Sequence, residues 1–192
     1  MLEVIDNWLG DKDLVRFLDR QFTYKTPHNY IEFANSYDAP TSIFGKNDSQ
    51  DVDSHIFYSY DFNPGDPLIR FLVLKAMDDI EARTGHTKLN CLRVHLAIQH
   101  AGQDVERHND GSDITAVYVA SANGGGTFDF HVEEINDVWT EKVPFVNNKL
   151  ILFDGKIKHE ALAPQGKRPR ILLVMKLGFS DNKSQGSLDA SK

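Results

Sequence analysis

The sequence predicts an α+β fold in which helices come first and a β-sandwich or jelly-roll core follows. Helical periodicity occurs only before Gly85, whereas the rest of the chain alternates short apolar segments with tight, glycine-containing turns. Neither an internal repeat nor a linker interrupts this pattern. We therefore expect one domain over residues 1–180, followed by a polar, disordered tail over residues 181–192.

Two helices are expected in the amino-terminal part of the chain. The first begins after Gly10, where Asp11 or Asp13 is placed to cap its amino end. Its apolar residues Leu14, Val15, Phe17 and Leu18 are expected on one helical face. The second covers residues 68–83, because Pro67 suits the first turn of a helix and Gly85 suits the position just after its end.

Strands are expected in most of the remaining chain. Residues 24–66 are rich in Pro, Asn, Asp, Ser and aromatic residues, which predicts loop apart from one short strand at His55–Tyr60. The clear strand candidates beyond Gly85 are Leu89–His100, Ile114–Ala120, Thr127–Val132, Lys149–Phe153 and Arg170–Leu177. In the first of these, His95 and Gln99 share a polar face opposite Leu92, Val94, Leu96 and Ile98. That polar face either lines the interior of a barrel or faces solvent.

The composition is that of an ordinary globular domain. Of the 192 residues, 41% are hydrophobic and 26% are charged. The formal net charge of −7 argues against a protein that mainly binds nucleic acid. The single cysteine, Cys91, cannot form an internal disulfide, no apolar run is long enough to span a membrane, and no signal peptide is evident. These features predict a protein of the reducing cytoplasm, and they leave the oligomeric state open.

The sharpest local feature is the triplet His108-Asn109-Asp110. With one residue between them, the imidazole and the carboxylate point to the same side of an extended segment and can bind one metal ion. His159, which follows a predicted strand and turn, is the candidate for a third ligand. Two histidines and one carboxylate leave three positions of an octahedron open, which suits non-haem Fe(II). The alternative is a coincidental triplet, since such triplets arise often by chance in a chain with eight histidines.

Two arginines stand at the start of the predicted strand that follows His159. Arg168 and Arg170 flank Pro169 at the start of an otherwise apolar strand. A guanidinium pairs bidentately with a carboxylate, so one of these arginines is expected to bind the distal carboxylate of 2-oxoglutarate. Alternation places both on one face, and we favour Arg170 because it lies further into the strand. The alternative is that both are solvated arginines of a turn.

These residues resemble the motif of the double-stranded β-helix 2-oxoglutarate/Fe(II) oxygenases. The segment HEALAPQGKR, which begins at His159, is similar to the H-E-V-x-P-V-x-x-G-x-R element of prolyl-4-hydroxylase-like members. Arg170-x5-Lys176 is similar to the R-x5-R strand of the AlkB-like branch, with lysine in place of the second arginine. The resemblance covers residues 89–178, about half of the chain. Gln99 stands where prolyl hydroxylases carry a tyrosine, and Leu172 stands where they carry a small polar residue.

The resemblance implies a double-stranded β-helix core with amino-terminal supporting helices. It implies that His108, Asp110 and His159 bind Fe(II), and that Arg170 or Arg168, with Gln99, binds the co-substrate 2-oxoglutarate. Ascorbate is an optional reductant of such enzymes. Because related halogenases lack the carboxylate ligand, the presence of Asp110 favours hydroxylation.

Three functions are compatible with these residues. The leading one is a hydroxylase acting on a protein side chain, a peptide or a free amino acid. The second is an AlkB-like nucleic-acid demethylase, which the acidic net charge and the lack of a basic, aromatic nucleotide-binding segment count against. The third is a non-catalytic jelly-roll binding protein or a cupin-like zinc protein, although the sequence lacks the HxH pair that cupins usually carry.

Overall fold

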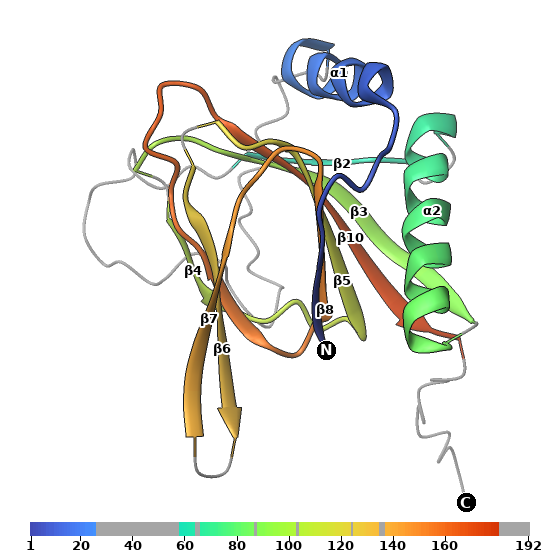
Figure 1. Ribbon diagram of the computed structural model, residues 1–192, viewed down its shortest axis with the longest axis vertical. Helices are drawn as coiled ribbons and strands as arrows, with labels where there is room; N and C mark the ends of the chain where they lie inside the picture. The colour runs from blue at the N-terminus through green and yellow to red at the C-terminus, as the bar shows by residue number, and fades with distance from the viewer. Residues whose placement is uncertain are drawn as a thin grey trace, which may run out of the picture.

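The protein consists of two antiparallel β-sheets that face each other, with helices on the outer side of the larger sheet (Figure 1). The computed structural model describes residues 1–25, 58–63, 66–86, 88–102, 104–123, 125–134 and 137–180. The larger sheet contains, in order across the sheet, β1 (Leu2–Ile5), β8 (Lys149–Asp154), β5 (Ile114–Ser121), β10 (Arg170–Phe179), β3 (Leu89–Gln99) and β2 (Tyr58–Asp61). The smaller sheet contains β4 (Val105–His108), β9 (Lys158–Ala161), β6 (Thr127–Glu134) and β7 (Asp137–Pro144). The predicted α+β fold with a jelly-roll core is confirmed.

The helices are α1 (Lys12–Arg20), which continues into a π-helical turn, η1 (Gln21–Lys25), and α2 (Pro67–Thr84). Oδ1 of Asp11 caps α1 by accepting hydrogen bonds from the backbone N–H groups of Asp13 and Leu14 at 2.8 and 3.2 Å. Gly85 ends α2 in the left-handed conformation, with φ of 72°, as the sequence predicted. Of the apolar residues of α1, Leu18 is fully buried whereas Phe17 is 51% exposed, because the short α1 contacts the protein along the narrow stripe that contains Leu18.

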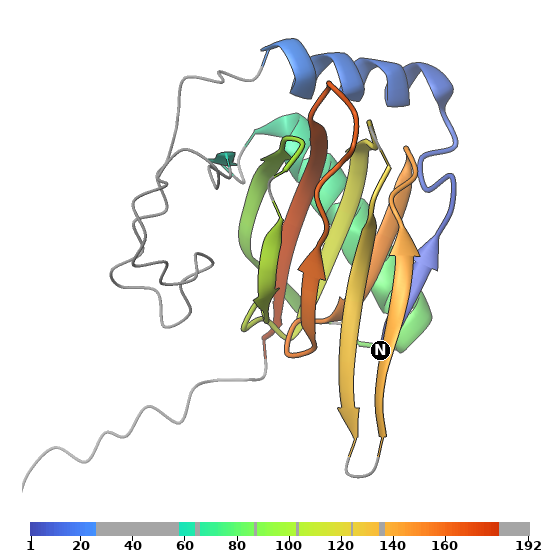
Figure 2. The same ribbon diagram turned by 90° about the vertical axis from the view of Figure 1, so that its left-hand side faces the viewer.

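The larger sheet separates two apolar cores. On β10, the side chains of Ile171, Leu173, Met175 and Leu177 pack with α1 and α2 on the outer side. The alternate residues Leu172 and Val174 point into the space between the two sheets. Figure 2 shows the smaller sheet toward the viewer and α2 on the far side of the larger sheet. The alternation of β10 thus gives one face to the helices and the other face to the interior of the sandwich.

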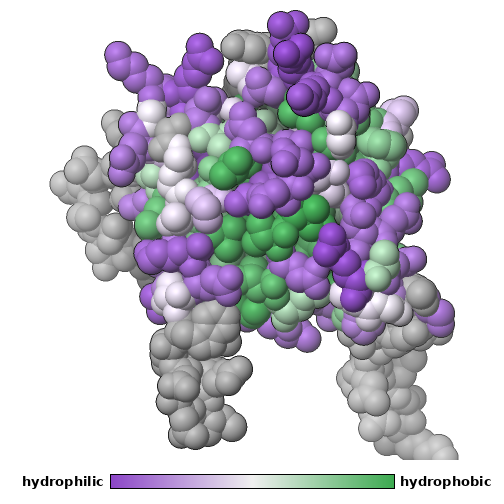
Figure 3. Space-filling model, in the orientation of Figure 1, coloured by the Kyte–Doolittle hydropathy of each residue, from purple (hydrophilic) through white to green (hydrophobic). Residues whose placement is uncertain are grey.

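One face of the molecule exposes an apolar patch. It lies near the centre of the face shown in Figure 3 and is bordered by polar side chains. In the described part of the chain, β1 and β7 are edge strands of their respective sheets. In the parts of the chain that the structure describes, no helix is long and apolar enough to span a membrane.

The structure contains strands that the sequence pattern did not predict. They are β1, β4, β7 and β9, of which β1, β4 and β9 have only four residues each and so offer little alternation to recognise. Leu92 also departs from the predicted pattern, because a register shift between Lys176 and Leu177 on the neighbouring β10 leaves its side chain 62% exposed. The predicted strand at 55–60 and the predicted tail at 181–192 lie partly and wholly outside the described residues, respectively.

Candidate functional site

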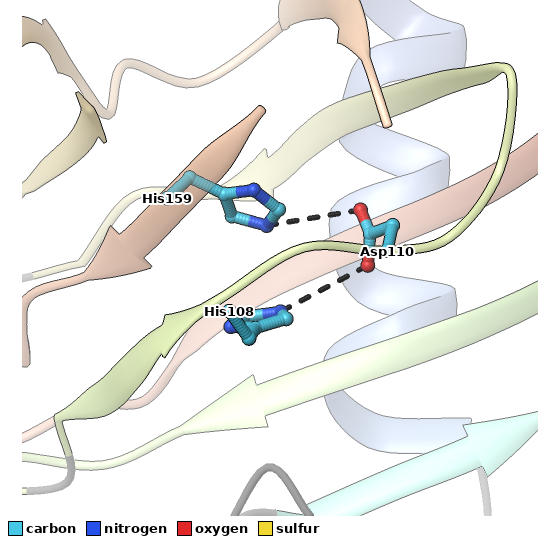
Figure 4. A group of neighbouring side chains, drawn as sticks. All are labelled: His108, Asp110 and His159. Carbon is cyan, nitrogen blue, oxygen red and sulfur yellow. Dashed lines mark ion pairs between the residues drawn. The ribbon is translucent and has the colours of Figure 1, made fainter. Parts of the chain in front are cut away.

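Two strands of the smaller sheet bring the predicted metal ligands together. β4 and β9 are antiparallel neighbours, and His108 and His159 are direct partners in their register. Asp110 follows β4 in the loop, and Figure 4 shows the three side chains directed toward one another. Nε2 of His108 lies 3.8 Å from Oδ1 of Asp110, and Nε2 of His159 lies 3.7 Å from Oδ2. The three potential ligand atoms all lie within 4.8 Å of one another, which is the arrangement of a group that can hold a metal ion.

The carboxylate of Asp110 is held on both oxygen atoms. Thr115 donates its hydroxyl to Oδ2 at 2.7 Å, and Nζ of Lys176 lies 2.9 Å from Oδ1. The backbone N–H of Asp110 donates to the carbonyl of Gly155 at 2.8 Å, which fixes the loop. Burial opposes ionisation of this carboxyl group, but the charges of His159 and Lys176 and the hydrogen bonds from Lys176 and Thr115 outweigh it and lower its pKa. Asp110 is therefore an anionic carboxylate with a fixed orientation.

The ring of His159 is oriented as a metal ligand would be. Its Nδ1 lies 3.0 Å from the backbone carbonyl of Ile157, which can only accept a hydrogen bond. A neutral ring must therefore carry its proton on Nδ1, and the lone pair of Nε2 then faces Asp110. Burial lowers the pKa of His159 to about 4, so the ring is neutral at physiological pH. The aromatic rings that pack against it are those of Phe128, Phe130 and Phe153.

Arg170 is fully buried at the start of β10, inside the sandwich. Its guanidinium donates to the carbonyls of Gly125 and Leu162 at 3.1 and 2.6 Å and to Oε1 of Gln99. It also lies over the ring of Phe145, with Cζ 3.7 Å from the centroid. Among the described residues Nε has no hydrogen-bond partner, and burial lowers the pKa of the guanidinium to about 9, although the charge of Asp104 acts in the opposite direction. The described acceptors that contact the guanidinium are all neutral, so this buried cation has no carboxylate at ion-pair distance among them.

The two other predicted co-substrate residues differ in their positions. Gln99 is buried opposite Arg170 in the register of β3 and β10, so the polar face of β3 lines the interior and not the solvent. Its carboxamide contacts Arg170 and donates from Nε2 to the carbonyl of Ala161 at 2.8 Å. Arg168 is exposed in the loop before β10 and does not join this cluster. Of the two arginines that alternation left equivalent, only Arg170 is inside the sandwich.

A buried wall connects the arginine to the histidine–aspartate cluster. Arg170 stands at the first residue of β10, whereas Lys176 stands near its other end and contacts Asp110. Between them on the same face lie Leu172 and Val174, with Ala97 of β3 beside them. The wall is therefore apolar in the middle and charged at both ends.

Three residues of the site were not assigned a role from the sequence. Lys176 had a usable signal, because alternation places it on the same face as Arg170. Thr115 and Gly155 offered none, since their contacts with Asp110 depend on the turn between β4 and β5 and on its packing against the turn after β8.

Comparisons with known proteins identify the fold. No protein-family model matches the sequence, and no curated protein matches it. Among solved structures, a prolyl-4-hydroxylase from Pseudomonas putida is similar over 93% of this chain and 92% of its own, at 18% identity and a TM-score of 0.63. A Trichoplax adhaerens prolyl hydroxylase in complex with a hypoxia-inducible-factor peptide is similar over 97% of this chain and 87% of its own, at 15% identity and a TM-score of 0.65.

A third similar structure is the non-heme α-ketoglutarate-dependent epimerase of nogalamycin biosynthesis. It matches 93% of this chain and 78% of its own, at 12% identity and a TM-score of 0.64. Identities this low establish the architecture and leave the reaction to be argued from the site. The chain has the double-stranded β-helix fold of the prolyl-4-hydroxylases and other 2-oxoglutarate/Fe(II) oxygenases.

Proposed function

We propose that the protein is an Fe(II)- and 2-oxoglutarate-dependent oxygenase that hydroxylates a protein side chain, a peptide or an amino acid. The observation that carries this proposal is that a three-residue group able to hold a metal ion contacts one end of the buried wall through Lys176, and that the other end of the wall carries a buried arginine with no carboxylate at ion-pair distance among the described residues. One end suits a divalent cation and the other end suits a carboxylate. A small dicarboxylate that binds the metal through one end would join them.

The ligand set of His108, Asp110 and His159 fits Fe(II). Two imidazole nitrogens and one carboxylate oxygen are the donors of the facial triad, which leaves the remaining positions open for a co-substrate and oxygen. The tautomer of His159 leaves the lone pair of Nε2 available to a metal ion, and the hydrogen bond from Thr115 orients the carboxylate of Asp110.

The surroundings of Arg170 fit the distal carboxylate of 2-oxoglutarate. A buried guanidinium is costly unless it is paired, and a carboxylate would supply both the missing charge and an acceptor for Nε. Gln99, Gly125 and Leu162 fix the direction of the guanidinium through neutral oxygen atoms, so its charge stays available for a ligand. The apolar residues of the wall exclude water from the space between the two ends.

When bound, Fe(II) would supply the reaction of 2-oxoglutarate with O₂ to succinate and carbon dioxide, in which one oxygen atom enters succinate and the other converts a C–H bond of the substrate to C–OH. The chain's own residues bind and orient the reactants. Arg170 would hold the distal carboxylate of the co-substrate, and His108, Asp110 and His159 would hold the metal ion. Asp110 occupies the position that halogenases leave to a halide, which favours hydroxylation. Ascorbate would act only as an auxiliary reductant.

The substrate class rests on two observations. The Pseudomonas prolyl-4-hydroxylase and this chain cover each other almost completely, and the Trichoplax relative is described in complex with a peptide. The net charge of −7 counts against a nucleic acid as the substrate. We therefore assign a protein side chain, a peptide or a free amino acid as the substrate class, ahead of nucleic-acid demethylation.

The test is succinate formation from 2-oxoglutarate by protein loaded anaerobically with Fe(II) and ascorbate and then exposed to air. Slow substrate-free turnover is expected for the wild type, and Asp110→Ala should abolish it, whereas Asp13→Ala, which removes an exposed carboxylate of α1, should not. The second readout is the visible absorption band that forms anaerobically when 2-oxoglutarate chelates Fe(II). Absence of both turnover and Fe(II)-dependent binding of 2-oxoglutarate would overturn the proposal.

A matched pair of variants tests the co-substrate residue. Arg170→Met should weaken 2-oxoglutarate binding by about a hundredfold, the value of a lost charge-assisted pair, yet retain binding of pyruvate, which lacks the distal carboxylate. Arg168→Met removes the neighbouring exposed arginine and should change neither affinity. The reverse pattern would transfer the role to Arg168.

A further inference from the structure

The metal end of the buried wall carries a cation that neither the metal nor the co-substrate requires. Nζ of Lys176 lies 2.9 Å from Oδ1 of Asp110 and donates to the backbone carbonyl of the same residue at 3.3 Å. The Lys176 side chain is 18% exposed, so the ammonium group is mostly withdrawn from solvent yet reachable from outside. A lysine in this position changes the charge of the site.

The sum of the formal charges in the loaded site indicates that one anion is missing. A divalent cation, the Asp110 carboxylate, the 2-oxoglutarate dianion and the Arg170 guanidinium together carry no net charge. The ammonium of Lys176 therefore leaves the loaded site with one positive charge. A largely buried charge without a counter-ion is unfavourable, so the site as a whole favours one further anion.

Arg93, the neighbouring cation on this face, does not change the net charge of the loaded site. Arg93 is the cross-strand partner of Lys176, and its guanidinium is bound by both carboxylate oxygens of Asp61 at 2.7 and 3.1 Å. That ion pair is neutral and lies at the rim, where both side chains are more than 40% exposed. Lys176 is thus the cation whose charge the loaded site leaves uncompensated at this end of the wall.

His95 supplies an independent observation at the same place. It lies on the inner face of β3, diagonal to Lys176 in the register of β3 and β10, where long side chains meet. Its ring is only 8% exposed, and its buried Nδ1 has no hydrogen-bond partner in the part of the chain that the structure describes. An orphaned buried nitrogen is costly and is expected where a ligand completes the contact. Burial lowers the pKa of His95 to about 3, so the ring is neutral and can donate from one nitrogen.

We propose that the metal end of the wall binds a carboxylate of the substrate, with Lys176 as its ionic partner and His95 as a hydrogen-bonding neighbour. This inference rests on the proposed function and narrows its substrate class to acidic side chains, or to amino acids with a free carboxylate near the reacting carbon. Lys176 turns from Asp110 toward the substrate when a cation relieves the negative charge of that ligand. The pocket then accepts a substrate carboxylate and disfavours its uncharged amide.

The experiment measures binding to the anaerobic Fe(II)–2-oxoglutarate protein through the change in its visible absorption band. The probes are capped peptides acetyl-Gly-Gly-X-Gly-Gly-amide with Asp, Glu, Asn or Gln at X, and free aspartate and proline beside their α-amides. Carboxylate probes should bind at least about tenfold more tightly than their amide partners. Preference among the capped peptides assigns a side-chain carboxylate, and preference among the free amino acids assigns a main-chain carboxylate.

Variants locate the effect. Lys176→Met should remove the preference, Lys176→Arg should keep most of it, and Lys12→Met, on the outside of α1, should not alter it. His95→Gln should weaken carboxylate and amide probes together, because it changes a hydrogen bond and not a charge. If Lys176→Met does not fold, the wild-type preference and its retention in Lys176→Arg decide the question.

The outcomes separate this inference from the proposed function. A wild-type protein that forms no Fe(II)-dependent band with 2-oxoglutarate overturns both. A normal band without any preference for carboxylate probes overturns this inference alone. So does a Lys176→Met variant that loses affinity for the metal or for 2-oxoglutarate while keeping the probe preference, since Lys176 would then serve the ligand Asp110 or the co-substrate.

Discussion

Gln99 connects Arg170 to the backbone of β9. Its Oε1 accepts a hydrogen bond from Nη2 of Arg170, and its Nε2 donates to the carbonyl of Ala161 at 2.8 Å. Because Gln99 and Arg170 are direct partners in the β3–β10 register, one carboxamide links three strands at the point where the guanidinium is held. The link is neutral, which keeps the charge of Arg170 uncompensated.

Replacing Gln99 by glutamate tests whether that neutrality matters. Gln99→Glu keeps the shape but places a carboxylate beside Arg170, so it should compete with 2-oxoglutarate and lower its affinity by about a hundredfold. Gln99→Leu removes only the orienting bonds and should cost about tenfold. Anaerobic titration with 2-oxoglutarate measures both. Wild-type affinity in Gln99→Glu would show that the carboxylate of the co-substrate binds elsewhere.

Gly126 makes room for Arg170. A Cβ atom at this position would lie 2.6 Å from Nη1 of Arg170, and the backbone φ is +91°. Gly126→Ala should therefore displace the guanidinium and weaken 2-oxoglutarate binding by at least about tenfold. Gly85→Ala is the control, since its φ of +72° imposes similar strain with no atom within 4 Å of the added Cβ. Both variants should lose thermal stability, and equal co-substrate affinities in the two would contradict the prediction.

The hydroxyl of Thr115 should matter for metal binding although it is not a ligand. It is fully buried, donates to Oδ2 of Asp110 at 2.7 Å and lies 2.9 Å from the hydroxyl of Ser112. Thr115→Val keeps the volume and should reduce affinity for Mn(II) or Fe(II) by about 10- to 100-fold, as for other residues that orient ligands. Thr140→Val, an exposed change on β7, serves as the control. A titration of Mn(II) followed by electron paramagnetic resonance measures the difference.

Acid should destabilise the metal-free protein through its buried neutral histidines. The pKa of His95 is about 3 in the folded protein against an ordinary 6.5, so between these values the unfolded chain binds more protons. The free energy of unfolding therefore falls as the pH drops below 6.5, by up to about 1.4 kcal/mol per pH unit from this residue. Denaturant unfolding at several pH values should give a shallower dependence for His95→Gln. If the free energy of unfolding depended on pH equally in the wild type and in His95→Gln, the His95 ring would be protonated in the folded state as readily as in the unfolded chain, which would contradict the prediction.

The sequence was sufficient for the features that depend on local alternation. The spacing of His108 and Asp110, and the inward direction of Arg170, follow from neighbouring residues on one strand. The same rule explains why His95 and Gln99 share a face, although only the structure shows that this face is buried. The cap residues Asp11 and Gly85 and the long helix α2 could likewise be predicted from neighbouring residues in the sequence.

The contacts that complete the site are non-local, which is why the sequence did not reveal them. Lys176 and Asp110 are 66 residues apart, and Gln99 and Arg170 are 71 residues apart. Each contact depends on the register of strands whose pairing no short segment specifies. Short strands were missed for a related reason: β9 has four residues, and its place in the smaller sheet is set by its neighbours β4 and β6.

The pairing of His108 with His159 sets a rule for how this chain can change length during evolution. Along β9, the exposed Lys158 alternates with the buried His159. One residue added within β9 before His159 would exchange their faces and turn the imidazole outward, while the rest of the sandwich stayed intact. Insertions of a single residue should thus be absent from β4 and β9 among functional descendants, even where neighbouring turns vary in length.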